Sequence, residues 1–293
     1  MRIPIGLSVI ATAIATAASS AQTSSNVGDV LTRVGERIAD YYKRAQSVIC
    51  IETYSVQPIA RDWGTVGLAR VTESELRVEM EAADGDGSGD ANVIRELRKV
   101  NGRAPRDRDK KSRDGCTDMN PLSPEPLSFL LPAGRSDYQF VAVAAGKGKD
   151  SNSLVIDYRT AESKSRIELI EDKLGRPDCF DFTGRLPKKG RVWVDAETYD
   201  VLRVEEQMTG PVDVRVPSPL QRKYLSLFDP VTVEREDMSI RYKRVTFREP
   251  DEALLLPESI VHLIVVRGGL QSTRRTHTFT DYRRFVTGAR LVK

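Results

Sequence analysis

The first periodic segment of the chain, residues 26–42, has the apolar spacing of an amphipathic helix. Its apolar residues recur every three or four positions and form one stripe: Val27, Val30, Leu31, Val34, Ile38, Tyr41 and Tyr42. Asn26 precedes the stripe and is a favourable N-cap, because its side-chain oxygen can accept from a free backbone N–H of the first turn. The stripe predicts a helix that packs one face against the rest of the protein.

After this helix the hydrophobic period changes to two, which is the period of β-strands. Short polar or glycine-containing turns separate the alternating segments, as in antiparallel meanders. Two short helical pieces are expected at 123–132 and 218–228. The segments predicted as strands are 47–56, 67–72, 75–80, 94–100, 138–144, 154–159, 166–171, 179–183, 191–194, 201–207, 238–247, 259–267 and 275–285.

A change of phase within one predicted strand indicates a bend in the sheet. Ile240 and Tyr242 lie on one face of their strand, whereas Val245 and Phe247 lie on the other. A β-bulge at residues 243–244 would restore a continuous apolar face, and bulges bend sheets. The predicted fold class is mainly β (α+β), a curled antiparallel sheet or half-barrel with an N-terminal helix and a short covering helix. Its concave side is expected to be apolar and its ionic groups to lie outside.

The segment Gly190–Glu205 (GRVWVDAETYDVLRVE) places four carboxylates near a tryptophan and raises the question of acid/base catalysis. Trp193 points away from the neighbouring valines and is expected to stack on Arg203 or another cross-strand neighbour. Glu197 and Asp200 fall in the turn between two strands and are expected to be solvated. Because a catalytic pair needs two carboxylates that converge in a water-poor cleft, we interpret the segment as a structural hairpin.

The beginning of the chain has the pattern of a secretory signal peptide. One positive charge is followed by an apolar stretch and by Ser19-Ser20-Ala21, which predicts cleavage after Ala21. An uncleaved anchor is the alternative, but the stretch is shorter than the roughly 20 residues that span a bilayer. We therefore expect a signal peptide at 1–21, a single half-barrel domain at 22–293, and export to the periplasm or the extracellular space. No transmembrane span is expected after cleavage.

Charge and cysteine content narrow the partners. The chain has 45 Lys and Arg against 42 Asp and Glu, a net charge of +3, which gives no electrostatic case for nucleic acid. An oxidising compartment would allow one disulfide and one free thiol among Cys50, Cys116 and Cys179, with three pairings open. Alternatively, Cys50 is a buried small hydrophobe within an apolar run.

Motifs for metal, cofactor or catalytic chemistry are weak. Residues 84–90 (DGDGSGD) begin like a calcium loop, but position twelve is Arg95 instead of a glutamate, so we expect a hairpin loop. The chain has two histidines. His262 is expected to be a core or barrel-wall residue, and His277 a residue on a sheet face. The sequence predicts no metal, no cofactor and no enzymatic activity, and a hydrolase is the least supported hypothesis.

The order of elements resembles the periplasmic lipoprotein-carrier superfamily, whose members have a LolA-like half-barrel, and in particular its uncharacterised exported bacterial relatives. The residues that carry this resemblance are the GRVWVD…VLRVEE hairpin, Leu256-Pro-Glu-Ser259 and Thr278–Phe285. Tyr199 stands where such hairpins usually have a glycine. The carriers are not enzymes, and the resemblance implies a hydrophobic cavity for acyl chains or similar ligands.

The leading hypothesis is an exported, non-enzymatic protein that binds a lipid, a lipoprotein or another apolar ligand in the concave face of the half-barrel. The residues expected to line the site are Phe129, Leu130, Val192, Val194, Leu202, Val204, Ile240 and Tyr242, with the first two in a lid. The same residues equally fit a solid core. The alternative function is an envelope scaffold or protein-interaction module with a solid core, which binds an envelope protein through its edge strands and its arginine-rich outer face.

Overall fold

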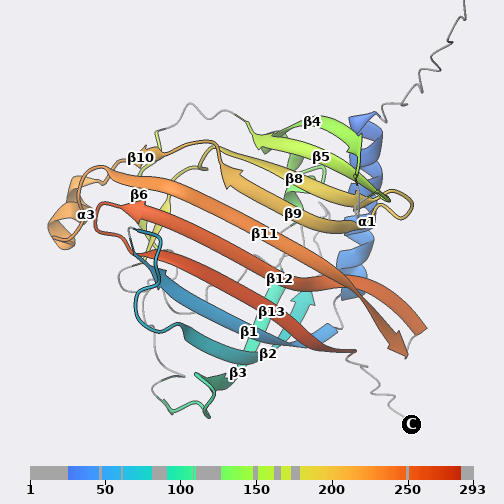
Figure 1. Cartoon of the computed structure of the whole chain (residues 1–293), viewed down its shortest axis with the longest axis horizontal. Coiled ribbons are helices and arrows are strands. Elements are labelled where there is room, and N and C mark those ends of the chain that lie inside the picture. Colours follow the sequence, from blue (N-terminus) through green and yellow to red (C-terminus); the bar gives the residue numbers. More distant parts are fainter. Residues whose placement is uncertain are drawn as a thin grey trace, which may run out of the picture.

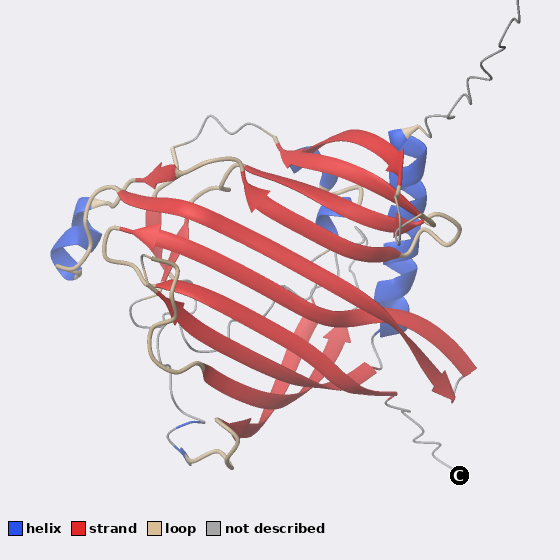
Figure 2. Cartoon of the chain, in the orientation of Figure 1, coloured by secondary structure: helices blue, strands red, loops and turns tan. Residues whose placement is uncertain are grey.

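Strands make up most of the described part of the chain, as the alternating pattern predicts (Figure 2). The structure, a computed structural model, describes residues 26–45, 48–60, 62–80, 91–107, 109, 127–147, 151–161, 166–172, 179–248 and 251–284. Its helices are α1 (Val27–Ala45), α3 (Ser218–Lys223) and the 3₁₀ helices η2 (Ser128–Leu130) and η3 (Arg135–Asp137). Its strands are β1 (Val48–Ile59), β2 (Arg70–Met80), β3 (Ala91–Val100), β4 (Tyr138–Ala145), β5 (Ser153–Thr160), β6 (Leu169–Glu171), β7 (Phe180–Phe182), β8 (Lys188–Asp195), β9 (Val201–Met208), β10 (Val212–Val214), β11 (Val231–Arg248), β12 (Asp251–Arg267) and β13 (Ser272–Arg284).

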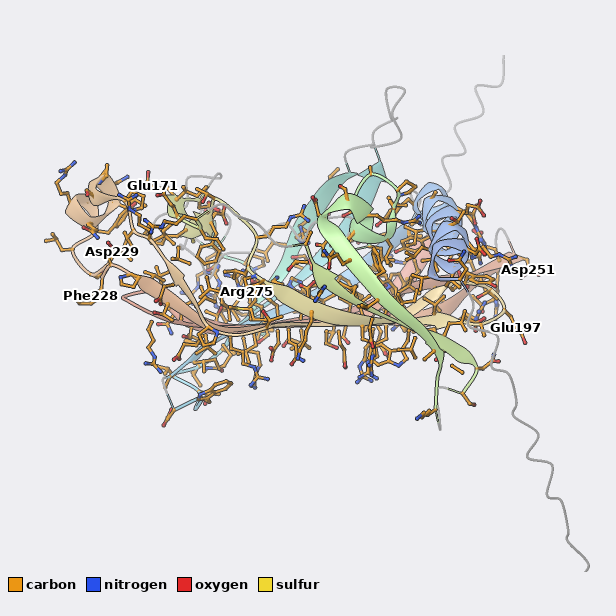
Figure 3. The ribbon with its side chains drawn as sticks, turned by 90° about the horizontal axis from the view of Figure 1, so that it is seen from above. Glu171, Glu197, Phe228, Asp229, Asp251 and Arg275 are labelled. Carbon is orange, nitrogen blue, oxygen red and sulfur yellow. The ribbon has the colours of Figure 1, made fainter. Side chains whose placement is uncertain are left out.

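An 11-stranded sheet has the order β3-β2-β1-β13-β12-β11-β9-β8-β5-β4, with β10 paired to β11 (Figure 1). Its strand pairings are antiparallel, and β3 and β4 form its open edges. A separate two-stranded sheet pairs β6 with β7. Figure 3 views the large sheet from its edge and shows α1 and the β6–β7 region on the same side of it, which we call the concave face. The predicted curled antiparallel sheet with an N-terminal helix is confirmed.

The helix α1 covers one end of the concave face with its predicted apolar stripe. Val30, Leu31, Val34 and Ile38 are buried and belong to one cluster with inward residues of the sheet, which we call the helix-covered core. Each such side chain contributes roughly 1.5–3 kcal/mol when it is removed from water. Asn26 caps the helix by accepting from Gly28 N–H at 3.1 Å, as predicted.

A second apolar cluster occupies the opposite end of the concave face, under β6, β7 and the loop around α3. We call this cluster the second core. Its buried members are Leu169, Leu186, Met208, Val214, Val216, Leu227, Val231, Val233 and Val266. The concave face thus carries two apolar regions, and the strands β9, β11 and β12 contribute residues to both.

Several strand boundaries differ from those predicted. Residues 67–72 and 75–80 were predicted as two strands, but one strand, β2, runs through them because Thr72 and Ser74 turn inward and are buried despite their polarity. The strand β10 was not predicted, and β11 and β12 begin earlier than expected. The β11–β12 register shifts between Arg241, which pairs with Ser259, and Tyr242, which pairs with Pro257. The extra residue is therefore Glu258 of β12, and the prediction of a bulge in β11 at residues 243–244 was wrong, because β11 pairs regularly with β12 from Tyr242 to Arg248.

The β8–β9 hairpin is structural, as predicted, but one of its acids was misplaced. The Arg203 guanidinium lies 4.3 Å from the centre of the Trp193 ring, so the predicted stacking is confirmed. Tyr199 has φ +61°, a left-handed conformation that usually belongs to glycine. Asp200 was expected to be solvated but is only 9% exposed, because Arg37 of α1 binds it with Nε–Oδ1 at 2.5 Å.

The structure decides the state of two of the three cysteines. Cys50 is a free, buried thiol, and burial together with the nearby Glu52 raises its pKa to about 12. Cys179 is disulfide-bonded. Cys116, the expected signal peptide at 1–21 and the loop at 84–90 lie outside the described residues. None of the helices in the described ranges is both long and apolar enough to cross a membrane.

Candidate functional site

Seven of the eight residues expected to line a site lie together in the helix-covered core. Their positions alternate inward along neighbouring strands, and they pack against α1 and η2. These residues are Phe129, Leu130, Val192, Val194, Val204, Ile240 and Tyr242. Leu202 is half-buried and outside this cluster, because a register shift in the β8–β9 pair turns Val201 inward in its place. Their role in ligand binding stays a prediction.

The expected lid is fixed to α1 by an arginine. Phe129 and Leu130 form η2, and Arg135 Nε donates to the Leu130 carbonyl at 2.8 Å. The same guanidinium donates to the carbonyl of Leu31 in α1. Gly35 makes room for it, since a Cβ there would lie 2.5 Å from Arg135 Nη2. The lid and the helix therefore form one packed unit.

A row of hydrogen-bonded polar side chains crosses the concave face between the two cores. We call it the charged row. It consists of Tyr158 on β5, Lys188 on β8, Glu206 on β9, Glu236 on β11 and His262 on β12. The Tyr158 hydroxyl donates to Glu206 at 3.1 Å, and Lys188 Nζ lies 3.1 Å from both Glu206 and Glu236. His262 Nε2 lies 2.9 Å from Glu236 Oε1. The prediction that the ionic groups stay outside was wrong, because strand alternation brings these residues to the same face as the buried valines.

Mutual contacts hold Glu236 and Lys188 of the charged row in their ionised forms. Burial disfavours the carboxylate of Glu236, but the hydrogen bond from His262 and the charge of Lys188 outweigh it and lower the pKa to about 2. Burial also disfavours the ammonium of Lys188, yet the two carboxylates raise its pKa above the usual value. Because a carboxylate only accepts, His262 carries its proton on Nε2. The row is thus a desolvated but satisfied network.

A second buried ion pair extends the polar band toward β3. Glu52 is 0% exposed and accepts from Arg95 Nε at 2.6 Å and from His277 Nδ1 at 2.8 Å. The ring of His277 lies 4.3 Å from that of Tyr54. Burial lowers the pKa of His277, so the imidazole is neutral at pH 7 and serves as a hydrogen-bond donor. Both histidines therefore lie on the concave face, each bound to a carboxylate, as core or sheet-face residues.

Above the charged row the concave face is hollowed to a volume of about 540 Å³. Lys188, Glu206, Glu236 and His262 form its floor. Its apolar walls are Tyr138, Phe180, Phe182, Leu186 and Ile264. This volume falls within the roughly 300–1,000 Å³ of small-molecule sites. By contrast, the space between α1 and Tyr242 in the helix-covered core is about 30 Å³, room for a water molecule and no more.

Three aromatic rings separate the hollow from the helix-covered core. Phe129 lies 5.2 Å from Tyr138 and 4.8 Å from Tyr158, measured between ring centres. Tyr158 lies across Gly190 of β8, where a Cβ would come within 2.3 Å of the Tyr158 ring. The glycine therefore lets the tyrosine cross the neighbouring strand and reach Glu206. Phe129, predicted as part of a lid, is one of the three rings of this aromatic wall.

The outer face carries a broad depression of about 1,090 Å³ that is lined by residues of seven strands. Trp193, Arg191 and Arg274 are among the residues that line it, which agrees with the expected arginine-rich outer face. Arg191 is bound to Asp157 at 2.5 Å.

Comparison with known proteins gives a likeness of fold. No protein-family model matches the sequence, and no curated protein matches it. A crystallised domain described as an outer membrane lipoprotein-sorting protein, from Vibrio parahaemolyticus, is 12% identical, covers 91% of this chain and 96% of its own, and has a TM-score of 0.37. A LolA superfamily protein from Nitrosomonas europaea is 10% identical, covers 90% of this chain and 97% of its own, and has a TM-score of 0.32. Both solved structures align along most of this chain at low sequence identity.

Proposed function

We propose that the chain is an exported, non-enzymatic carrier that holds a lipid or a lipid-modified ligand in the hollow of the concave face. The observation that supports this most is the pairing of aromatic and aliphatic walls with a polar floor in one hollow of about 540 Å³. Such a lining suits an amphiphile, because the walls take apolar surface and the floor takes a polar end. A purely apolar ligand would leave the floor without hydrogen bonds from water.

The predicted lining residues keep a place in this proposal. An acyl chain longer than the hollow would meet the aromatic wall at Tyr138 and Phe129, and behind it lies the helix-covered core. Since that core is packed, a longer chain would enter only if η2 and α1 move together away from the sheet. Arg135, which joins these two elements, is the contact that such a movement would preserve.

The test is recovery of bound lipid from the full chain, produced with its own leader and purified without detergent from the bacterial envelope fraction. We expect organic extraction and mass spectrometry to recover an amphiphile in a fixed ratio to protein. Phe182→Ala, which removes part of the wall, is expected to reduce the amount recovered several-fold. Phe228→Ala is the matched control, because Phe228 is 67% exposed and outside the hollow (Figure 3).

Two results would contradict the proposal. One is reproducible absence of lipid from the folded wild-type protein. The other is equal loss in both phenylalanine variants, which would place the lipid elsewhere on the surface. A single stoichiometric protein partner in crosslinking, with no lipid, would favour the interaction module instead.

A further inference from the structure

The charges that line the hollow are balanced in number but separated in space. Three cations and three carboxylates line it, namely Arg185, Lys188 and Arg275 and Asp181, Glu206 and Glu236. The charged row itself contains two of the carboxylates and only one of the cations. The floor is therefore the more negative part of the hollow, while the two arginines stand apart from the row on β13 and on the segment before β8.

One oxygen of the floor is open to a ligand. Lys188 and His262 both contact Oε1 of Glu236. Its Oε2 receives no hydrogen bond from any residue in the described ranges. Both oxygens of Glu206 are in use, because Lys188 contacts one and Tyr158 donates to the other. The ionised Glu236 thus presents a free acceptor that a ligand N–H could fill.

The arginines supply the opposite charge. Arg275 lies on the concave side of the sheet in Figure 3 and lines the hollow from β13. Arg185 stands at the edge of the hollow, 5.5 Å from the centre of the Tyr138 ring and 2.7 Å from Asp137. Guanidinium groups bind phosphate and carboxylate oxygens in a planar, two-pronged geometry.

From this arrangement, and resting on the proposed function, we propose that the ligand is an amphiphile with a zwitterionic head group. Its ammonium binds Glu236 in the charged row, and its phosphate or carboxylate faces Arg275 and Arg185. A head group that has the anion but no ammonium would cover Glu236 and leave the charge of its Oε2 without a donor. Taking such a charge out of water is costly unless it is paired, so the hollow selects against it.

The experiment measures binding of lysolipids that share one acyl chain, below their micelle concentrations, to the folded full-length protein by calorimetry. We expect lysophosphatidylethanolamine to bind at least about tenfold more tightly than lysophosphatidylglycerol, because one charge-assisted hydrogen bond accounts for roughly that factor. Glu236→Gln is expected to remove most of this preference. Glu234→Gln is the matched control: Glu234 lies on the same strand and pairs with Arg267 instead of lining the hollow.

The outcomes separate this inference from the proposed function. Equal or tighter binding of lysophosphatidylglycerol to the wild type would overturn the head-group inference and leave the carrier function standing. Binding of neither lysolipid, together with absence of extracted lipid, would overturn the carrier function. Phosphoethanolamine alone would test the head without the tail: binding as tight as that of its lysolipid would support the charge arrangement but contradict a role for the apolar walls. The wild-type comparison does not depend on how well any variant folds.

Discussion

Glu236 should make the unfolding free energy of the protein decrease as the pH falls below about 5. Its pKa falls from 4.5 to about 2 in the folded chain. A depressed pKa means that the stabilisation is complete above the unfolded value and is lost as the pH falls through the folded one. A shift of this size corresponds to about 3 kcal/mol of unfolding free energy at pH 7, since one unit is about 1.4 kcal/mol.

The stabilisation that Glu236 contributes should decrease measurably well above pH 2, before the group is fully protonated. By the same linkage relation, about 1 kcal/mol should be lost between pH 7 and pH 4, and about 2 kcal/mol by pH 3. Glu236→Gln removes the carboxylate, so this variant should be about 3 kcal/mol less stable than the wild type at pH 7. Near pH 3 the difference should shrink to about 1 kcal/mol, because the wild-type group is then partly protonated.

Urea unfolding followed by fluorescence of the two tryptophans measures these differences. Glu234→Gln is the control on the same strand, since its partner Arg267 lies on the protein surface. A gap between wild type and Glu236→Gln that stays constant from pH 7 to pH 3 would refute the reasoning. So would an equal narrowing of the gap for Glu234→Gln, because the effect would then belong to carboxylates in general.

Two further substitutions test the structure around the hollow and the hairpin. Gly190→Ala puts a Cβ within 2.3 Å of the Tyr158 ring, so it should cost about 1–3 kcal/mol of unfolding free energy; Gly210→Ala, where nothing lies within 4 Å, should cost far less. Asp200→Asn weakens an ion pair to α1 at 2.5 Å and should cost about 1–2 kcal/mol, whereas the exposed Glu197→Gln should cost little. Thermal unfolding of the four variants measures these differences. Equal destabilisation by the two glycine variants, or by the two carboxylate variants, would contradict the contacts described for Gly190 or Asp200.

Periodicity predicted the secondary structure well where a residue type and its burial agree. The stripe that includes Val34 and Ile38 is buried under the sheet as expected, and Val192, Val194 and Val204 face inward together. Alternation failed where a polar residue takes an inward position. Thr72 and Ser74 are polar but buried, and because polar residues usually mark exposed positions, the pattern predicted a break in β2 that the structure does not have.

The charged row could have been found by carrying the same alternation further along each strand. Val204 faces inward, so Glu206, two residues later, must face the same side. Likewise Val192 and Gly190 place Lys188 inward. What the sequence does not contain is the pairing register, which brings side chains from five strands within hydrogen-bond distance. Asp200 was misplaced for the same reason, since its partner lies 163 residues away along the chain.

Alternation does not show whether an inward residue borders a cavity or belongs to a packed core. That depends on whether a helix such as α1 packs over the same part of the sheet. The inward valines of β8 and β9 meet α1, whose apolar stripe closes the space to about 30 Å³. Two to four residues further along these strands α1 no longer covers the sheet, and the inward residues become charged. A charge without a covering helix requires either water or a polar ligand, whereas a valine in that place would require a further apolar element. The position of the hollow thus follows from where the helix ends its cover, and the chemistry of the hollow follows from the charged side chains that replace the valines there.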